Sequence, residues 1–397
     1  PQEKQVRLRF RLDGVLQDIL YFEHRYFKLL LSRIKLVSEL KLNVHDRPQD
    51  GRFSIHLKGI EIEIRTSALP GPYGESLVLR ILNPKTIAVA FEDLGMPPML
   101  AKFLLKEIEK PNGMILTTGP TGSGKTTTLY AFLKKIYTPG VKIITLEEPI
   151  EYHVQGITQT QTNAKAGYDF ASGLRSILRQ DPDIIMVGEI RDLDTAKTAI
   201  NAALTGHLVF STLHTNDAAG TIPRLIDLGV EPNILAPAIN VSMAQRLIRK
   251  LCKECRKKDK PNEDELRVIK NIIDSLPKNV KKPSLTNISV WHAVGCQKCH
   301  GTGYKGRMGI FEAILIDDEL EQLILKHPSE AEIKKAASKQ GILNMRQDGI
   351  LKIIEGETSF EEVTRIIELE ASSSPSETAV ADEKKEAKSA DKSADKE

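Results

Sequence analysis

The chain has 397 residues, 41% of them hydrophobic, and its 56 basic and 53 acidic residues leave a formal net charge of +3. This length predicts two to four domains with ample apolar side chains for their cores, and the balanced charge excludes a general electrostatic attraction to nucleic acid or to an anionic membrane. No apolar run reaches the roughly eighteen residues of a membrane-spanning helix, no signal peptide is recognisable, and the first residue is Pro1 rather than Met, so we expect that the true N-terminus is missing.

The first 83 residues alternate between apolar and polar side chains, as in VRLRFRLDGVL and ESLVLRIL, around a helical segment near residues 24–42. This pattern predicts a small α/β domain over residues 1–83. Asn83 and Pro84 interrupt it, and residues 84–97 contain further Gly and Pro residues, so we expect a linker there.

Residues 98–250 carry short apolar runs, MILTT, KIITL, DIIMVGEI and HLVFSTL, separated by amphipathic stretches. This alternation is typical of βαβ units and predicts a parallel sheet covered by helices.

The four cysteines form two C-x-x-C pairs separated by forty residues, Cys252 with Cys255 and Cys296 with Cys299. Four thiolates from two such pairs suit a closed tetrahedral zinc site, so we expect a structural zinc module over residues 251–303 and a reducing, cytoplasmic setting. Redox chemistry of the thioredoxin type is the alternative for a single pair, and it fits two pairs less well.

The C-terminal part divides into two segments. Residues 304–370 have a helical apolar period and are expected to be largely helical, whereas residues 371–397 are nearly devoid of large apolar side chains and are expected to be disordered. The basic stretch over residues 246–260 is interpreted mainly as a solvated face, with partner docking or nucleic-acid binding by the zinc module as the alternative.

The sequence GPTGSGKT over residues 119–126 matches the phosphate-binding loop G-x-x-x-x-G-K-[ST], between an apolar strand and a predicted helix. Backbone N–H groups of such a loop surround phosphates, its lysine bridges the β- and γ-phosphates, and its hydroxyl binds Mg²⁺. A chance Gly-rich turn is the alternative, and the flanking elements disfavour it. The candidate nucleotide-binding residues are Gly119, Pro120, Thr121, Gly122, Ser123, Gly124, Lys125, Thr126 and Thr127.

Acidic residues end two of the predicted strands: Glu147 and Glu148 follow KIITL, and Glu189 follows DIIMVG. The carboxyl ends of parallel strands line the ligand crevice, so these acids are expected to meet the phosphate loop. One can orient a water molecule and the other can hold Mg²⁺, which is the chemistry of hydrolysis. A lone Glu would more often be a solvated acid at the start of a helix, but two on two apolar strands favour catalysis.

Two histidines flank the fourth apolar run, His207 before it and His214 directly after it. His214 is the candidate for contact with the γ-phosphate, because it follows the strand at its carboxyl end. For His207 a structural hydrogen bond is an equally good interpretation.

Together these motifs resemble the GspE/PilB family of secretion ATPases, which power type II secretion and type IV pilus assembly. The resemblance covers Arg7 to about Ile367 and rests on GPTGSGKT, ITLEEPIEY, LRQDPDIIMVGEIRD and TGHLVFSTLHTND. It implies a RecA-like P-loop ATPase core, preceded by a small PAS-like α/β domain and followed by a tetracysteine zinc module and a helical C-terminal region.

The resemblance also implies roles for individual residues. Glu147 would activate water and Glu189 would be the Walker B acid, while Arg52 and Arg65 match arginines that reach a phosphate from a neighbouring domain or subunit. Arg80 and Arg179 are weaker candidates. The family usually has Glu-Asp-Pro where this chain has Glu147-Glu148-Pro149, so the role of Glu148 stays open.

The same resemblance implies ATP, Mg²⁺ and Zn²⁺ as cofactors, a homo-hexamer, and contact with an inner-membrane platform protein and its adaptor. The protein would be cytoplasmic and peripheral to the inner membrane through these partners, without nucleic acid and without membrane insertion. Retraction motors of the family usually lack the metal module, so its presence favours secretion or pilus assembly. From the resemblance, an adaptor domain is expected before the first domain, and we expect this sequence not to include it.

We therefore predict an ATP-hydrolysing motor. The alternative from another class is a RecA-like nucleic-acid translocase, which would need basic and aromatic residues along a pore, whereas aromatic residues make up only 5% of the chain. A GTP-dependent switch is disfavoured because no N-K-x-D sequence is present.

Overall fold

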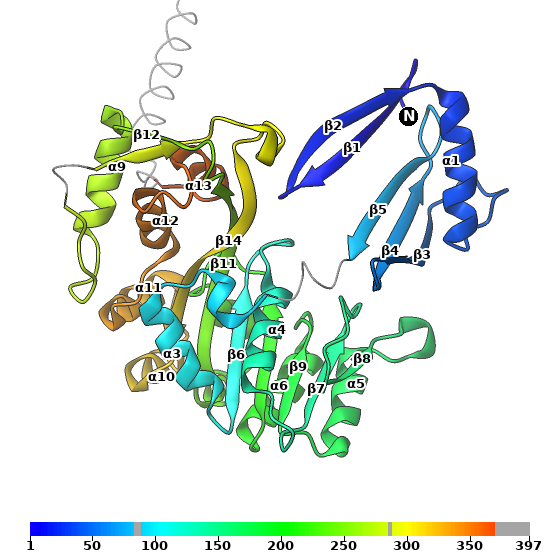
Figure 1. The fold of residues 1–397 in the computed structure, drawn as a ribbon. Coiled ribbons are helices and arrows are strands. Elements are labelled where there is room, and N and C mark those ends of the chain that lie inside the picture. Colours follow the sequence, from blue (N-terminus) through cyan, green and yellow to red (C-terminus); the bar gives the residue numbers. More distant parts are fainter. Residues whose placement is uncertain (83–88, 285–287, 370–397) are drawn as a thin grey trace, which may run out of the picture.

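The computed structural model describes residues 1–82, 89–284 and 288–369. Figure 1 shows an N-terminal unit in blue and a larger body built around a central sheet. The predicted disordered tail and the first part of the predicted linker lie outside the described residues. Within the described part of the chain, no helix combines the length and apolarity needed to cross a bilayer.

The N-terminal unit contains a β-hairpin, a helix and a three-stranded antiparallel sheet of order β3-β4-β5. Along β4 the side chains alternate, with Ile62, Ile64 and Ala68 buried while Arg65 is only partly covered, as expected for a strand with one face on a core. The elements are β1 (Val6–Leu12), β2 (Val15–Phe22), α1 (His24–Val37), β3 (Gln49–Leu57), β4 (Ile60–Leu69) and β5 (Ser76–Leu82).

The larger body is organised by a seven-stranded sheet of order β14-β11-β6-β10-β9-β7-β8. All neighbouring pairs are parallel except the pair of β14 with β11. The strands are β6 (Gly113–Thr118), β7 (Ile143–Glu147), β8 (Thr158–Gln161), β9 (Ile184–Val187), β10 (Leu208–Leu213), β11 (Ile239–Leu251) and β14 (Tyr304–Leu315). This arrangement confirms the predicted α/β fold with a mostly parallel sheet.

Helices cover both faces of this sheet, which explains why its central strands are continuous apolar runs. Successive residues of β6 belong to different cores: Ile115 packs with α3 and α4, whereas Leu116 packs with α5 and α6. The helical elements of this part are η1 (Phe91–Leu94), α3 (Pro98–Ile108), α4 (Lys125–Ile136), η2 (Ala164–Ala166), α5 (Phe170–Ile177), η3 (Leu178–Gln180), α6 (Leu193–Leu204), α7 (Thr221–Asp227), α8 (Pro232–Leu235) and η4 (Ala236–Ala238).

The C-terminal segments return to the sheet before they become helical. We expected residues 304–370 to be largely helical, and β14 at their start was not predicted. Gly306 and Gly309 oppose a helix here, while Ile310 and Phe311 favour a strand, and β11 offers a free edge for pairing. The remaining elements are β12 (Lys257–Asp259), α9 (Glu263–Asp274), β13 (Val290–His292), η6 (Gln297–Cys299), α10 (Asp318–Ile324), α11 (Glu330–Ala337), η7 (Ser338–Gln340), α12 (Met345–Ile354) and α13 (Phe360–Ile366).

A buried ion pair ties the last helix to the sheet. Glu362 on α13 is fully buried and accepts hydrogen bonds from Arg249 Nη2 at 2.6 Å and from Arg365 Nη2 at 2.6 Å. The Arg249 backbone N–H donates to the same carboxylate at 3.0 Å. These donors outweigh the effect of burial, so the pKa of Glu362 lies below its usual range.

Candidate active site

The phosphate loop connects the end of β6 to the start of α4, as the motif predicts. Gly119, Gly122 and Gly124 have φ values of 145°, 81° and 93°, which other residue types adopt only with strain. A Cβ atom on Gly119 would lie 2.7 Å from the carbonyl oxygen of Gln245 on β11, so the loop is also packed too tightly for a side chain there. The backbone is therefore shaped as a cradle at a helix N-terminus, which fits a phosphate group.

Two side chains of this loop are suited to bind phosphate. Lys125 Nζ donates to the carbonyl oxygen of Gly119 at 2.7 Å, and burial lowers the pKa of Lys125 although Glu189 opposes this effect. The buried Ser123 hydroxyl has no hydrogen-bond partner among the described residues. The cradle thus holds a half-buried cation and a free hydroxyl, both of which phosphate oxygens can satisfy.

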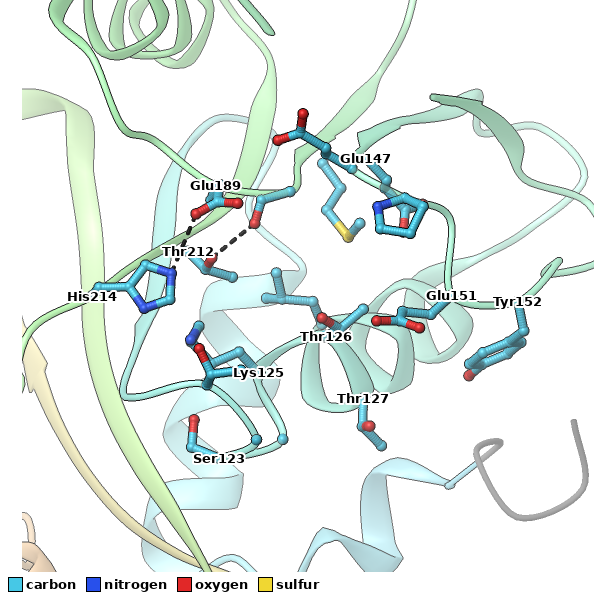
Figure 2. A pocket seen from close by; sticks show the side chains of 18 of the residues that line it. Ser123, Lys125, Thr126, Thr127, Glu147, Glu151, Tyr152, Glu189, Thr212 and His214 are labelled. Carbon is cyan, nitrogen blue, oxygen red and sulfur yellow. Dashed lines mark hydrogen bonds and ion pairs between the residues drawn. The ribbon is translucent and has the colours of Figure 1, made fainter. Parts of the chain in front are cut away.

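A cavity of about 600 Å³ opens above this loop. Figure 2 shows that the labelled side chains around it come from the phosphate loop and the start of α4, from the ends of β7, β9 and β10, and, for Glu151 and Tyr152, from the connection between β7 and β8. The structure therefore brings together candidates that lie far apart in the sequence, namely Thr121, Gly122, Ser123, Gly124, Lys125, Thr126, Thr127, Glu147, Glu189 and His214.

Glu189 lies just beyond the end of β9 and has two cationic or potentially cationic partners. His214 Nε2 lies 3.2 Å from its Oε2, and Arg191 Nη2 lies 2.5 Å from its Oε1. Arg191 also pairs with Glu148 at 3.0 Å, and its contacts with Glu189 and Glu148 raise its pKa. Arg191 was not predicted from the sequence, although an arginine two positions after Glu189 could have been recognised as its partner.

Glu147, the last residue of β7, is only 2% exposed. Its carboxylate accepts hydrogen bonds from the Tyr130 hydroxyl, from Thr145 Oγ1 at 2.6 Å and from Gln159 Nε2 at 3.2 Å. Burial raises its pKa although these donors oppose the shift. Glu148 is different, because its side chain is 43% exposed and pairs with Arg191.

The N-terminal unit supplies arginines at the rim of the cavity. Arg65 Nη2 donates to the carbonyl oxygen of Ile150 at 2.6 Å, and its Nη1 lies 3.5 Å from Glu151. Arg80 lines the cavity and lies 3.9 Å from the same carboxylate. Arg52 pairs with Arg65 across β3 and β4 but is exposed and is not among the residues that line the cavity.

Another arginine of the cavity was not predicted. Arg307 on β14 lines it and lies 3.9 Å from Asp13 in the turn between β1 and β2, while Asp13 accepts a hydrogen bond from the Gly306 N–H at 2.8 Å. Arg307 follows the second cysteine pair, and nothing in its sequence neighbourhood indicates a phosphate site. Arg179 instead donates to the carbonyl oxygen of Arg175 at 3.0 Å and does not line the cavity.

His207 lies at the opposite end of β10 from His214. Its Nδ1 is 3.0 Å from the carbonyl oxygen of Ala202, so it has a backbone partner at the end of α6. This contact is consistent with the structural interpretation of His207.

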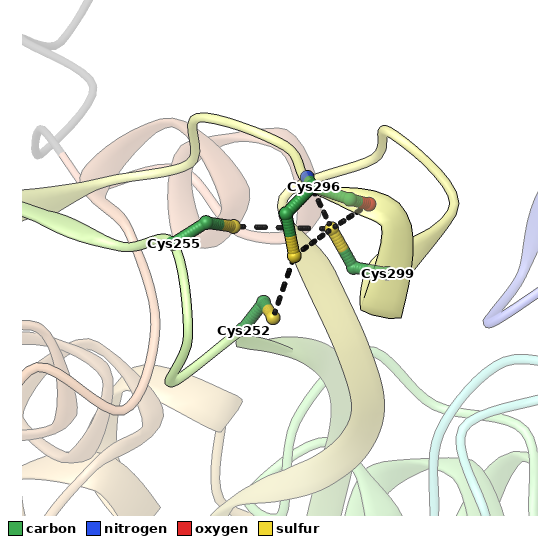
Figure 3. Close-up of side chains that lie close together, drawn as sticks. All are labelled: Cys252, Cys255, Cys296 and Cys299. Atoms are coloured by element: carbon green, nitrogen blue, oxygen red, sulfur yellow. Dashed lines mark hydrogen bonds between the residues drawn. The ribbon is translucent and has the colours of Figure 1, made fainter.

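The four cysteines converge although they come from two segments (Figure 3). Their Sγ atoms lie within 4.8 Å of one another, with separations of 3.9 Å for Cys252–Cys296, 3.8 Å for Cys255–Cys299 and 3.7 Å for Cys296–Cys299. Zn–S bonds of about 2.3 Å in a tetrahedron require neighbouring sulfurs about 3.8 Å apart, so the cluster has the size of a zinc site.

The Cys299 thiol ionises more readily than an ordinary cysteine. Burial opposes ionisation of Cys299, but the N–H groups of Cys296 and Gly303, at 3.1 Å and 3.2 Å, contribute to lowering its pKa to about 6. Thiolates are the form in which cysteine binds zinc. The donor set therefore fits zinc in number and spacing.

The family model described as Type II/IV secretion system protein matches residues 1–365. Among similar proteins, the Type II secretion system protein E of Pseudomonas aeruginosa is 45% identical over 92% of this chain and 70% of its own length. The Type IV pilus assembly ATPase PilB of Thermus thermophilus is 43% identical over 91% of this chain and 40% of its own length.

Solved structures of similar fold include a pilus motor and an ATPase. The pilus retraction motor PilT with bound ADP has a TM-score of 0.59 and 25% identity, and it covers 91% of this chain and 92% of its own. The ATPase DotB of Legionella pneumophila has a TM-score of 0.61 at 20% identity, over 91% of this chain and 90% of its own. The comparisons agree with the motifs and not with the nucleic-acid alternative. The chain belongs to the family of type II/IV secretion system proteins.

Proposed function

We propose that this chain is an ATP-hydrolysing motor that powers type II protein secretion or type IV pilus assembly. Membership of the family makes it an ATPase, and its relatives include a type II secretion protein E and a type IV pilus assembly ATPase. The observation that supports the proposal most strongly is one cavity in which a phosphate cradle meets carboxylates from the ends of two strands.

In this proposal the cradle binds the triphosphate. The glycine-rich backbone and the N-terminus of α4 donate N–H groups to the β-phosphate, and the Lys125 ammonium neutralises the β- and γ-phosphates. Thr126 and Glu189 would hold Mg²⁺, which, when bound, neutralises charge that develops on the transferred group.

Glu147 would orient the attacking water and accept its proton. A carboxylate whose pKa is raised by burial is a stronger base than an exposed one, and its burial keeps bulk water away from it. His214 lies beside Glu189, where loss of the γ-phosphate would change its surroundings.

These roles are tested by Glu147→Gln and Glu189→Gln. Each variant should bind ATP within about threefold of the wild type and lose about 100-fold or more of its turnover, since general bases and charge stabilisers contribute at this scale. ATP binding is measured by fluorescence of a nucleotide analogue, and turnover by phosphate release. Normal turnover in both variants would refute the assignment.

Arginines at the rim would couple hydrolysis to movement. Arg80 of the N-terminal unit and Arg307 of β14 line the cavity, and Arg65 of the N-terminal unit contacts the 148–157 loop beside it through the carbonyl oxygen of Ile150. ATP would draw them inward, and phosphate release would let them separate. These motions would pass from subunit to subunit of a homo-hexamer in the cytoplasm. They would act on an inner-membrane platform protein through its adaptor.

Assembly and partner are tested separately. Mass photometry with a non-hydrolysable ATP analogue should show six copies per particle. Cross-linking of the protein in its native cells, followed by identification of captured membrane proteins, should recover a platform protein of a secretion or pilus machine. Recovery of nucleic acid and no membrane component would contradict this part of the proposal.

We also propose a structural zinc ion at Cys252, Cys255, Cys296 and Cys299. Four protein ligands leave no open position for a substrate, so the ion would hold the two segments together and take no part in hydrolysis.

A further inference from the structure

The 148–157 loop joins β7 to β8 and lies between the N-terminal unit and the buried carboxylate of Glu147. From one side, Arg65 holds it through the carbonyl oxygen of Ile150 at 2.6 Å and through Glu151 at 3.5 Å. Figure 2 shows Glu151 and Tyr152 of this loop beside the cavity, on the same side as Thr126 and Thr127. The N-terminal unit therefore contacts the loop directly through Arg65.

From the other side, one amide group on β8 holds the same loop. Gln159 Oε1 accepts a hydrogen bond from the Val154 N–H at 2.7 Å, and Gln159 Nε2 donates to the carbonyl oxygen of Tyr152 at 3.1 Å. The same Nε2 also lies 3.2 Å from Glu147 Oε1 and 3.2 Å from the Tyr130 hydroxyl oxygen, so its two N–H groups are shared among three acceptors. Only a side chain with both a donor and an acceptor can make these contacts together.

A continuous path of contacts thus runs from the N-terminal unit to Glu147. It passes from Arg65 to the loop backbone, along the loop to Tyr152 and Val154, and through the Gln159 amide to the carboxylate. The Tyr152 ring also packs edge-on against Tyr130, with centroids 4.7 Å apart, and Tyr130 is itself a donor to Glu147.

We propose that Gln159 is a positioning residue: it links the contacts of Arg65 with the 148–157 loop to the orientation of the Glu147 carboxylate. Glu147 is then aligned for its reaction when the N-terminal unit holds the loop, and it loses that alignment when the unit withdraws. This inference rests on the role proposed above for Glu147.

Because Glu147 has other hydrogen-bond donors, loss of Gln159 should change the orientation of its carboxylate without unfolding the protein. Without Gln159, the carboxylate still accepts hydrogen bonds from Thr145 and Tyr130, so it is not left as an unsatisfied buried charge. The carboxylate loses one of the hydrogen bonds that fix its orientation, and it loses its connection to the 148–157 loop. Gln159 also lowers the pKa of Glu147, so its removal should move the pKa upward.

Gln159→Leu tests the proposal, with Gln161→Leu as the matched control. Gln161 lies two residues along the same strand, and its Oε1 accepts a hydrogen bond from the Ile150 N–H of the loop at 3.3 Å. It is the backbone partner of Glu147 between β7 and β8, but among the described residues its side chain forms no hydrogen bond with the Glu147 carboxylate. Gln159→Leu should lower kcat about tenfold or more, because small misalignments of catalytic groups have effects of this size. KM should stay within about twofold, and the acid limb of the kcat–pH profile should move to higher pH.

Gln161→Leu should leave kcat within about twofold of the wild type and the acid limb unmoved. Combining Gln159→Leu with Arg65→Ala should reduce kcat hardly further than the more damaging single change, because both interrupt one path. Thermal unfolding shows whether each variant folds, and Gln159→Asn, whose shorter amide cannot span the same contacts, replaces the Leu variant if that one does not.

The inference is overturned if Gln159→Leu behaves as Gln161→Leu does, or if the effects of Gln159→Leu and Arg65→Ala multiply. The role of Glu147 is tested independently. Normal turnover in Glu147→Gln would refute that role, whereas an inactive Glu147→Gln together with a normal Gln159→Leu would refute the positioning role alone.

Discussion

Removal of one cysteine, in Cys299→Ser, should release the zinc proposed for the tetracysteine cluster. Loss of an outer-shell partner of a zinc ligand typically weakens binding by about 10- to 100-fold, so loss of a ligand itself should weaken it by about 100-fold or more. The observed sulfur separations of 3.7 to 3.9 Å match a closed tetrahedron, and Cys299 is 3% exposed, so no other side chain or solvent route replaces it easily.

The consequence should be local. The cluster joins the end of β11 to the start of β14, while the phosphate loop lies beyond β11 on β6 and α4. Metal loss should therefore raise amide hydrogen exchange around Cys252 and Cys296 and leave the ATP affinity within about threefold. Gln297→Ala is the matched control, because Gln297 is exposed and lies between two of the ligands.

The assay is metal analysis of protein purified under reducing conditions, followed by hydrogen exchange with and without a chelator. Wild type and Gln297→Ala should each contain one zinc per chain, and Cys299→Ser should contain much less. Metal-free wild-type protein, or a chelated protein with unchanged exchange in this module, would refute the reasoning.

Two further predictions concern binding and stability. Lys125→Ala should weaken ATP binding by about 10-fold or more, because it removes a half-buried cation from the phosphate cradle, and a wild-type affinity would contradict the role of the cradle. Glu362→Gln should lower the free energy of unfolding at pH 7 by about 3 kcal/mol, because it leaves Arg249 without its buried partner. The folded-state pKa of Glu362 is lowered, so this stabilisation is present above its unfolded pKa of about 4.3 and is lost as the pH falls through the folded value. Denaturant unfolding at pH 7 and at acidic pH should show the difference between wild type and variant shrink, and a constant difference would contradict the assignment.

Local patterns in the sequence predicted the features that depend on neighbouring residues. The apolar runs located β6, β7, β9 and β10, and the glycine spacing located the phosphate loop. Topology then placed Glu147 and Glu189 at one sheet edge, because parallel strands present their carboxyl ends together.

Features that depend on distant partners were missed. Arg307 enters the cavity because β14 pairs with β11, and β14 itself was not predicted. Gln159 lies on a short polar strand whose importance appears only when the 148–157 loop folds back over it. Arg52 and Arg65 are equivalent by motif, but only Arg65 contacts that loop.

The central claim is that water takes the terminal phosphoryl group of ATP in the cavity above the phosphate loop. It is tested most directly by a single turnover of ATP in ¹⁸O-labelled water, with isotope analysis of the phosphate released. The wild type should release phosphate that carries a solvent oxygen. Glu147→Gln should keep ATP bound and release no phosphate. Transfer of the phosphoryl group to the protein or to another acceptor, or an equal rate of release by Glu147→Gln, would contradict the claim.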